Sequence, residues 1–411
     1  MKILILAHFY PPEMGGPPAR LHGLARWLAA FGHQVTVITG FPNYPTGVVA
    51  GEYRGKLRAI ERLDGVDVLR TWVYASSFRS SWRRLANNLS FAGSAIVAGL
   101  TSGRSYDVIL ASSPPLFVGL AGWVLARVLR IPFVFDIRDL WPEVVIEAGE
   151  LAPDAPLTRG LAALARGIYR AADHITPVTE RKRAKLIATG VPPEKLTVVS
   201  NGADLDRVPV HLNGHKRSEL GLDDKFVVLY AGLIGIAQGV EIAVHAADRL
   251  REHDDIHFLI VGDGVRKPEL LAEARRLGLT NVTMLPRQPR EAIPAFLSAA
   301  DACLVPLVNT SLDDAVPSKL LEAWGHGRPV ILAAGGEAAE LVMRSGGGVV
   351  VSPDDPGQLA EAVLSLKRDQ ARLADYAHSG RAFVAEHFDR AALACRMEQV
   401  LQRVVATRAT R

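Results

Sequence analysis

Two carboxylates and a lysine in the second half of the sequence have the types and spacing to bind a phosphorylated sugar. Asp314 lies eight residues before Glu322, and Lys319 lies between them. Pro317 suits the first position of a helix, and the glycines beyond Glu322 predict where that helix ends. The amino end of a helix attracts phosphate, and Lys319 adds positive charge in the first turn. The stretch could therefore hold a sugar nucleotide, and an ordinary capped helix with solvated carboxylates explains it equally well.

A second group of charged residues lies at the end of the predicted strand Phe133–Asp136. Asp136, Arg138 and Asp139 come at or just after its carboxyl end. Open α/β sheets bind ligands at the carboxyl ends of their strands, so these side chains are candidates for a site. A salt-bridged surface loop would produce the same pattern.

Glycine-bearing loops follow the first predicted strand of each half of the chain. Gly15 and Gly16 come after the run KILILA, and Gly232 and Gly235 come after the run FVVLY. Glycine lets the backbone approach a ligand closely at a helix start. Neither loop matches G-x-G-x-x-G, and the sequence has no P-loop motif, so the loops alone do not identify a ligand.

Continuous apolar runs alternate with helix-like segments along the chain. Such runs predict parallel strands that are buried on both faces. The predicted strands are Lys2–Ala7, Gln34–Thr39, Val66–Thr71, Asp107–Ala111, Phe133–Asp136, His174–Val178, Phe226–Tyr230, His257–Val261, Val282–Leu285, Ala302–Pro306, Val330–Ala333 and Gly346–Val351. The alternation predicts an α/β fold of two successive doubly wound units, with a ligand between them.

A polar stretch divides the two units. We expect an N-terminal Rossmann-like domain at 1–205, a linker at 206–224 and a C-terminal Rossmann-like domain at 225–382. The last segment, 383–411, is expected to form a helix that packs back on the N-terminal domain. Two uncharged stretches, at 85–103 and 108–126, are interpreted as buried elements because their Asn, Ser, Gly and Pro residues argue against membrane spans.

The composition is that of a globular protein. Of 411 residues, 49% are hydrophobic and 22% charged, with a net charge of +4. No nucleic-acid-binding motif accompanies the basic residues. The two cysteines, Cys303 and Cys395, are far apart, which fits a reducing compartment and gives no metal-ligand cluster. The short apolar run at the N-terminus does not resemble a signal peptide.

Residues 78–92 predict a basic amphipathic helix. Aromatic and leucine side chains share one face of it, and arginines lie beside that face. A helix of this kind is typical of binding to a membrane surface, and the alternative is a surface helix packed on its own domain. The candidate membrane- and acceptor-contact residues are Phe78, Arg79, Trp82, Arg83 and Arg84.

Six segments in this order resemble a known family. They are HFYPPEMGGPPAR, FDIRDLWPE, VSNGADLDRV, YAGLIGIAQGVE, IVGDGVRKPEL and DDAVPSKLLEAWGHGRPV. The chain is similar along its whole length to retaining glycosyltransferase family 4, and most similar there to the WbuB-like transferases of bacterial surface polysaccharides. The resemblance implies the GT-B fold, in which two Rossmann-like domains face a central cleft. The N-terminal domain would take the acceptor and the C-terminal domain the sugar-nucleotide donor.

The resemblance also implies donor-binding residues. Glu322 matches the second carboxylate of the family's E-x7-E motif and would bind ribose hydroxyls, while Asp314 stands where the family more often has Glu. Lys319 and the backbone around the preceding turn would meet the diphosphate. The donor-binding candidates are Gly15, Gly16, Gly232, Gly235, Arg266, Lys267, Ala315, Val316, Ser318, Lys319 and Glu322.

The catalytic candidates are Asp136, Arg138, Lys319 and Asp314. Asp136 falls near the position where many relatives place a histidine close to the reacting sugar, and Arg138 would support the site. Many relatives carry an Arg and a Lys in the loop after the first strand of the second domain, and this chain has neither. The hypothesis is that Lys319, Arg266 or Lys267 supplies the missing charge.

The activity implied by the resemblance is that of a retaining hexosyltransferase with a UDP-linked donor, whose sugar is expected to be an N-acetylated 6-deoxyhexose. The implied acceptor is a lipid-linked saccharide at the inner face of the plasma membrane, within polysaccharide synthesis. The family requires no metal and no further cofactor. A sugar-nucleotide epimerase, which can share this two-domain shape, and a non-catalytic nucleotide-sugar-binding subunit are the alternatives.

Overall fold

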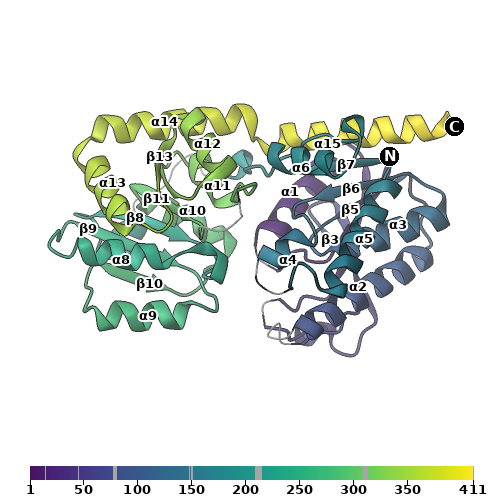
Figure 1. Cartoon of the computed structure of the whole chain (residues 1–411), viewed down its shortest axis with the longest axis horizontal. Helices are drawn as coiled ribbons and strands as arrows, with labels where there is room; N and C mark the ends of the chain where they lie inside the picture. Colours follow the sequence, from purple (N-terminus) through teal and green to yellow (C-terminus); the bar gives the residue numbers. More distant parts are fainter. Residues whose placement is uncertain are drawn as a thin grey trace. The chain divides into compact units, whose positions relative to one another are not determined.

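The chain forms two compact α/β units, seen here in a computed structural model (Figure 1). The first unit comprises Met1–Ser200 and Arg390–Arg411, and the second comprises Asn201–Asp389. The structure describes residues 1–13, 15–44, 46–76, 81–147, 149, 151–208, 215–308 and 313–410.

The first unit is a helix-covered sheet. Its strands are β1 (Lys2–Ala7), β2 (Gln34–Gly40), β3 (Arg58–Leu63), β4 (Val66–Thr71), β5 (Val108–Ser112), β6 (Phe133–Ile137) and β7 (His174–Pro177). Its helices are α1 (Gly16–Ala30), α2 (Ser81–Thr101), α3 (Leu116–Leu129), α4 (Glu143–Glu147), α5 (Pro156–Ala171), α6 (Glu180–Ala188) and α15 (Arg390–Ala409), with short 3₁₀ turns η1 (Gly51–Tyr53) and η2 (Pro193–Lys195).

The seven strands of the first unit lie in the order β3-β4-β2-β1-β5-β6-β7. All neighbouring pairs are parallel except β3 and β4. The side chains of β1 show why both faces are covered. Leu4 and Leu6 join a core with α2, α3, α5 and α6, whereas Ile3 and Ile5 join a core with α1 and α15. Alternate residues of a strand point to opposite faces, so a continuous apolar run needs helices on both.

The second unit repeats this architecture with six strands. They are β8 (Phe226–Ala231), β9 (Ile256–Val261), β10 (Val282–Leu285), β11 (Ala302–Pro306), β12 (Val330–Ala333) and β13 (Gly348–Val351). The helices are α7 (His215–Glu219), α8 (Glu241–Arg249), α9 (Lys267–Arg276), α10 (Ile293–Ala299), α11 (Ser318–Gly325), α12 (Gly336–Ser345), α13 (Pro356–Arg368) and α14 (Gln370–His387), with 3₁₀ turns η3 (Leu205–Arg207), η4 (Ile236–Gln238) and η5 (Arg290–Ala292).

The second sheet is parallel throughout, in the order β10-β9-β8-β11-β12-β13. One face packs on α10, α11, α12 and α14, and the other packs on α8, α9 and α13. The strand order reverses between β8 and β11, which is where open α/β sheets bind ligands. The loops after these two strands carry the glycines and the carboxylates that the sequence singled out.

The predicted fold class is confirmed, and the differences are local. The sequence analysis missed β3, whose charged sequence RAIERL alternates in burial at the edge of the sheet. It also ended the basic helix at residue 92, whereas α2 continues to Thr101. The uncharged stretches belong to α2, β5 and α3. Among the described residues, no helix combines the length and the apolar character needed to cross a membrane.

Candidate active site

Lys319 lies in the first turn of α11, at the carboxyl edge of the second sheet. Pro317 has extended backbone and caps the helix, so α11 begins one residue later than predicted. The Lys319 ammonium donates a 2.8 Å hydrogen bond to the Tyr230 hydroxyl and lies 4.2 Å from the centre of the Tyr230 ring. Burial lowers the pKa of Lys319 to about 8, and the Glu322 carboxylate opposes that shift.

The absence of a side chain at Gly232 leaves space for the Lys319 ammonium. A methyl group at position 232 would lie 3.1 Å from Lys319 Nζ, and the residue adopts φ +155°, which side chains rarely adopt. The turn after β9 packs tightly against the turn after β8. A methyl group on Gly262 would lie 1.9 Å from the carbonyl oxygen of Gly232. The two glycine-bearing turns therefore pack backbone against backbone, and the turn at Gly232 leaves space beside the Lys319 ammonium for close approach of a ligand.

Lys267 is another cation proposed for the diphosphate, and its ammonium forms hydrogen bonds with the turns around it. Its ammonium donates to the carbonyl oxygens of Gly262 and Leu285, at 2.7 Å and 2.9 Å, and to Asp263 Oδ1 at 2.9 Å. These bonds hold together the turns that follow β9 and β10. Arg266 forms an ion pair with Glu269 at 3.0 Å on the same helix. Of the three candidate cations, Lys319 is thus the one that the structure places beside Gly232.

The loop before α11 is anchored on both sides. The Asp313 carbonyl accepts a 2.8 Å hydrogen bond from the backbone of Glu337, and the Val316 carbonyl accepts one of 3.3 Å from Asn201 Nδ2. Asp314 is buried, whereas Ala315, Val316, Ser318 and Glu322 are half-buried. The structure therefore brings the carboxylates and Lys319 onto one loop and helix, as the spacing predicted.

Gly235 lies in the loop that lacks the family's basic pair. Its added methyl group would lie 2.5 Å from Gln238 Oε1, so the Gln238 side chain folds over this glycine. Leu233, in the same loop, is exposed. The loop offers an amide and backbone groups at this position, where many family members carry charge.

In the first unit, Asp136 lies at the carboxyl end of β6 and is fully buried. Its Oδ1 accepts hydrogen bonds from Arg20 Nη2 at 2.7 Å and from Thr176 Oγ1 at 3.0 Å, and its Oδ2 accepts one from Ser112 Oγ at 2.7 Å. Three neighbouring elements thus converge on this carboxylate. The geometry favours a positioning role for Asp136 over contact with the reacting sugar.

Arg20 is the partner that the sequence analysis missed. It projects from α1, four residues after Gly16, and is almost fully buried. Besides Asp136, it donates to the carbonyl oxygens of Val199 and Ser200, at 2.9 Å and 2.6 Å. Arg20 therefore links α1 to Val199 and Ser200, where the N-terminal segment of the first unit ends. The sequence did contain a signal for this role, because Arg20 is a charged residue within the apolar pattern of the predicted helix.

Arg138 lies just beyond β6 and is half-buried. Burial lowers the pKa of its guanidinium to about 10, with Asp139 opposing that shift. Its Nε and Nη1 atoms are buried and have no hydrogen-bond partner among the residues that the structure describes. Because buried guanidinium donors normally find acceptors, Arg138 is the candidate in this unit for binding an anionic or hydroxyl-rich group.

A buried polar cluster around the loop after β1 was not anticipated. His8 Nε2 lies 2.8 Å from Asn87 Oδ1, and Glu13 Oε1 accepts hydrogen bonds from the backbone N–H groups of Asn43 and Tyr44 at 3.0 Å and 2.9 Å. Burial raises the pKa of Glu13 to about 7 and lowers that of His8 to about 4. The cluster ties together the loops after β1 and β2 and the first half of α2.

The candidate membrane residues lie at the start of α2. Trp82 is 74% exposed, and Leu89 and Leu100 on the same helical face are 45% and 44% exposed. Arg83 is also exposed, and Arg84 is half-buried. Phe78 and Arg79 lie outside the described residues. The opposite side of α2 is buried in the core, so the helix presents an apolar stripe flanked by arginine.

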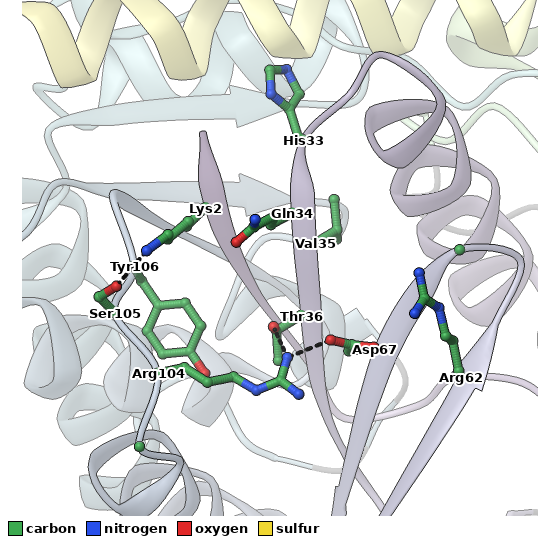
Figure 2. A pocket seen from close by; sticks show the side chains of 12 residues that line it. Lys2, His33, Gln34, Val35, Thr36, Arg62, Asp67, Arg104, Ser105 and Tyr106 are labelled. Carbon is green, nitrogen blue, oxygen red and sulfur yellow. Dashed lines mark hydrogen bonds and ion pairs between the residues drawn. The ribbon is translucent and has the colours of Figure 1, made fainter.

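A cavity of about 420 Å³ lies at the other edge of the first sheet, around the amino ends of β1 and β2 (Figure 2). Arg104 Nη1 bonds there to Thr36 Oγ1 at 3.1 Å and to Asp67 Oδ2 at 2.5 Å. Lys2 Nζ donates to Ser105 Oγ at 2.9 Å. No predicted site residue lines this cavity, and Lys2, His33 and Arg104 have hydrogen-bond partners in the protein.

Comparisons with known proteins agree with this arrangement. Residues 15–202 match the model of the glycosyl transferase 4-like domain, and residues 225–369 match that of glycosyl transferases group 1. The protein named as the colanic acid biosynthesis glycosyl transferase WcaI of Escherichia coli (strain K12) is 31% identical over 345 residues, which cover 82% of each chain.

Two solved structures share the fold along nearly the whole chain. Sucrose-phosphate synthase of Thermosynechococcus elongatus has a TM-score of 0.79 at 20% identity and covers 99% of both chains. Anabaena HepE in complex with UDP-glucose has a TM-score of 0.72 at 20% identity, covering 98% of this chain and all of the other. The chain therefore belongs to the glycosyltransferases of the GT-B fold that combine a glycosyl transferase 4-like domain with a group 1 domain.

Proposed function

We propose that this enzyme is a retaining hexosyltransferase that uses a UDP-linked sugar and a lipid-linked saccharide acceptor in bacterial polysaccharide synthesis. The observation that carries the proposal is the Lys319 ammonium, held in the first turn of α11 beside the glycine turn at Gly232. A cation at a helix start, surrounded by backbone, suits the diphosphate of a sugar nucleotide. Lys319 would stabilise the charge that develops on the leaving diphosphate.

The carboxylates near Lys319 would orient the rest of the donor. Glu322 lies one turn further along α11 and would accept hydrogen bonds from ribose hydroxyls. Asp314 would contact the hexose, with a side chain one methylene shorter than the glutamate usual in the family. Positive charge from Lys319 and the helix start would stabilise the leaving group without a metal ion.

The relatives support the choice of donor and pathway. HepE has been solved with UDP-glucose, and WcaI is named for colanic acid, a polysaccharide. The apolar stripe and arginines of α2 support an acceptor that is carried at an anionic membrane surface. We propose that the enzyme associates peripherally with the inner face of the plasma membrane through this helix.

The test is a transfer assay with the full-length protein. A thermal-shift screen of nucleotide sugars, including UDP-linked N-acetylated 6-deoxyhexoses, selects the donor, because binding raises the unfolding temperature. The donor is then incubated with polyprenyl-diphosphate-linked saccharides, and the product is analysed by NMR. We expect transfer that depends on the acceptor, an α-linkage from an α-linked donor, and unchanged activity in the presence of EDTA.

Other outcomes identify what is wrong. Epimerised sugar nucleotide formed without acceptor indicates an epimerase. Donor binding without turnover on a broad acceptor panel indicates a binding subunit. A product with the anomeric configuration opposite to that of the donor contradicts retention, and loss of activity with EDTA contradicts the metal-independent mechanism.

A further inference from the structure

We propose that Tyr230 is a positioning residue for binding of the donor diphosphate. Its hydroxyl and its ring both contact the Lys319 ammonium and hold it in place. The inference rests on the proposed function, since it assigns Lys319 to the diphosphate. Tyr230 is the penultimate residue of β8, and nothing in the sequence distinguishes it from the core residues around it. Its role follows from its two contacts with one lysine.

The two contacts use different parts of the tyrosine. The ring lies under the ammonium at 4.2 Å, within the range of a cation–π interaction. The hydroxyl accepts the 2.8 Å hydrogen bond from Lys319 Nζ. The same hydroxyl donates its own proton to the carbonyl oxygen of Leu233, so its lone pairs remain directed to the lysine. The lysine is therefore fixed in both distance and direction.

The position of Tyr230 explains why the contact lies at the ligand edge. Its ring belongs to the core under α8, α9 and α13, whereas Lys319 is carried by α11 on the other face of the sheet. The two side chains can meet past the end of β8, where Gly232 leaves space. Tyr230 is 1% exposed, so packing immobilises the ring. A rigid platform thus restrains a flexible cation.

Such a platform matters here because the loop after β8 has no basic residue. Leu233 and Gln238 are its larger side chains near Gly235. A lysine has a flexible stem and loses rotamer entropy when a ligand orders it. A lysine that is ordered in advance avoids that loss at the moment of binding. One preorganised cation can then replace part of what a basic pair supplies.

The charge state of Lys319 depends on its surroundings in a defined direction. Burial lowers its pKa to about 8, and Glu322 raises it. Burial also raises the pKa of Tyr230, so its hydroxyl stays protonated and neutral. A hydrogen bond from an ammonium to a neutral oxygen favours the charged form. Removing that bond should therefore lower the pKa of Lys319 further.

The test compares wild type with Tyr230→Phe in binding of UDP and of uridine. The variant keeps the ring and loses only the hydroxyl. We expect about tenfold weaker UDP binding, because a hydrogen bond to a charged group is lost, and unchanged uridine binding. The alkaline limb of UDP binding should move to lower pH by on the order of one unit. Lys319→Met should weaken UDP binding at least as much.

A matched control is available in the same unit. Tyr376 on α14 accepts a 2.7 Å hydrogen bond from Arg372 Nε and has the Arg372 guanidinium over its ring at 5.2 Å. Tyr376→Phe should change neither ligand's affinity. Equal loss of UDP and uridine binding in Tyr230→Phe, or unchanged UDP affinity and pH dependence, would overturn the positioning role while the proposed function stands. If the wild type binds no nucleoside diphosphate, the proposed function fails first.

Discussion

Asp136 occupies the residue position where a catalytic group was expected, yet each of its oxygens already accepts a hydrogen bond. Arg20, Thr176 and Ser112 donate to it from α1, β7 and β5. A buried carboxylate whose two oxygens both accept hydrogen bonds holds its neighbours in register. We therefore predict that Asp136 contributes to activity indirectly, through the elements that it connects.

Asp136→Asn should therefore cost stability. The substitution leaves the buried Arg20 guanidinium without its anionic partner, and we expect the free energy of unfolding of the first unit to fall by about 3 kcal/mol. Urea denaturation measures the loss, and hydrogen exchange of β6 and β7 localises it. UDP affinity should change little, because the proposed diphosphate contacts are made mainly by Lys319 and the start of α11 in the second unit.

The control for this prediction is Asp67→Asn. Asp67 pairs with Arg104, and both side chains are more than a third exposed, so the loss should stay below about 1 kcal/mol. Abolished transfer in Asp136→Asn with unchanged stability and folding would restore the catalytic assignment.

The sequence made Lys319 and Glu322 candidates because a loop-to-helix transition, a proline and the spacing of charges all lie within one short stretch. Tyr230 could not be identified in this way. In FVVLY it is one more large residue of a buried strand, and its hydroxyl matters only because α11 returns to it from a distant part of the chain. Glu13 was likewise read only as part of a motif, since its burial depends on loops after β1 and β2.

At the scale of elements, the apolar runs predicted the parallel strands of both sheets to within about two residues. The strand that escaped, β3, has burial on alternate residues and charges on its exposed face. An edge strand with one solvated face carries no continuous apolar run, so the rule used for the central strands does not detect it. The length of α2 was underestimated because its second half loses its charge as it packs against the core.

The exposed stripe of α2 makes a prediction about membranes. Arg83→Ala should weaken binding to vesicles that contain anionic lipid by about 1 kcal/mol, or roughly fivefold, because each basic residue near the surface contributes on that order. Trp82→Ala should also weaken binding, through loss of its exposed apolar surface. Cosedimentation with vesicles of increasing phosphatidylglycerol content measures both effects.

Arg127→Ala is the matched control, since Arg127 is an exposed arginine at the other end of a neighbouring helix, α3. Its binding should equal that of wild type. Equal losses in Arg83→Ala and Arg127→Ala would point to net charge alone, and no loss in either Arg83→Ala or Trp82→Ala would remove α2 from the membrane proposal.

At the scale of the whole molecule, the important feature is that the first unit is built from two separate segments of the chain. The first unit is discontinuous, because α15 returns to it after the second unit is complete. The buried face of α15 packs with α1 against the sheet through Leu393, Ala394, Met397, Val400, Leu401 and Val404. The last helix is therefore part of the first unit's core.

Met397→Ala tests how much the packing of α15 contributes to the stability of the first unit. Met397 is fully buried, so truncation should lower the free energy of unfolding of the first unit by about 2 to 4 kcal/mol. Gln399→Ala, on the exposed side of α15, should cost less than about 0.5 kcal/mol. Thermal denaturation of both variants measures the difference. Similar effects of the two substitutions would show that α15 contributes little to the core.

The order in which these segments leave the ribosome has a consequence for biosynthesis. The second unit is continuous, so all of its strands and helices are available before α15 has been translated. The first unit begins earlier but must wait with Ile3, Ile5 and their neighbours covered on that face by α1 alone. Nascent chains that stall before residue 390 would thus carry a finished second unit and a partly uncovered apolar sheet, the kind of surface that chaperones bind.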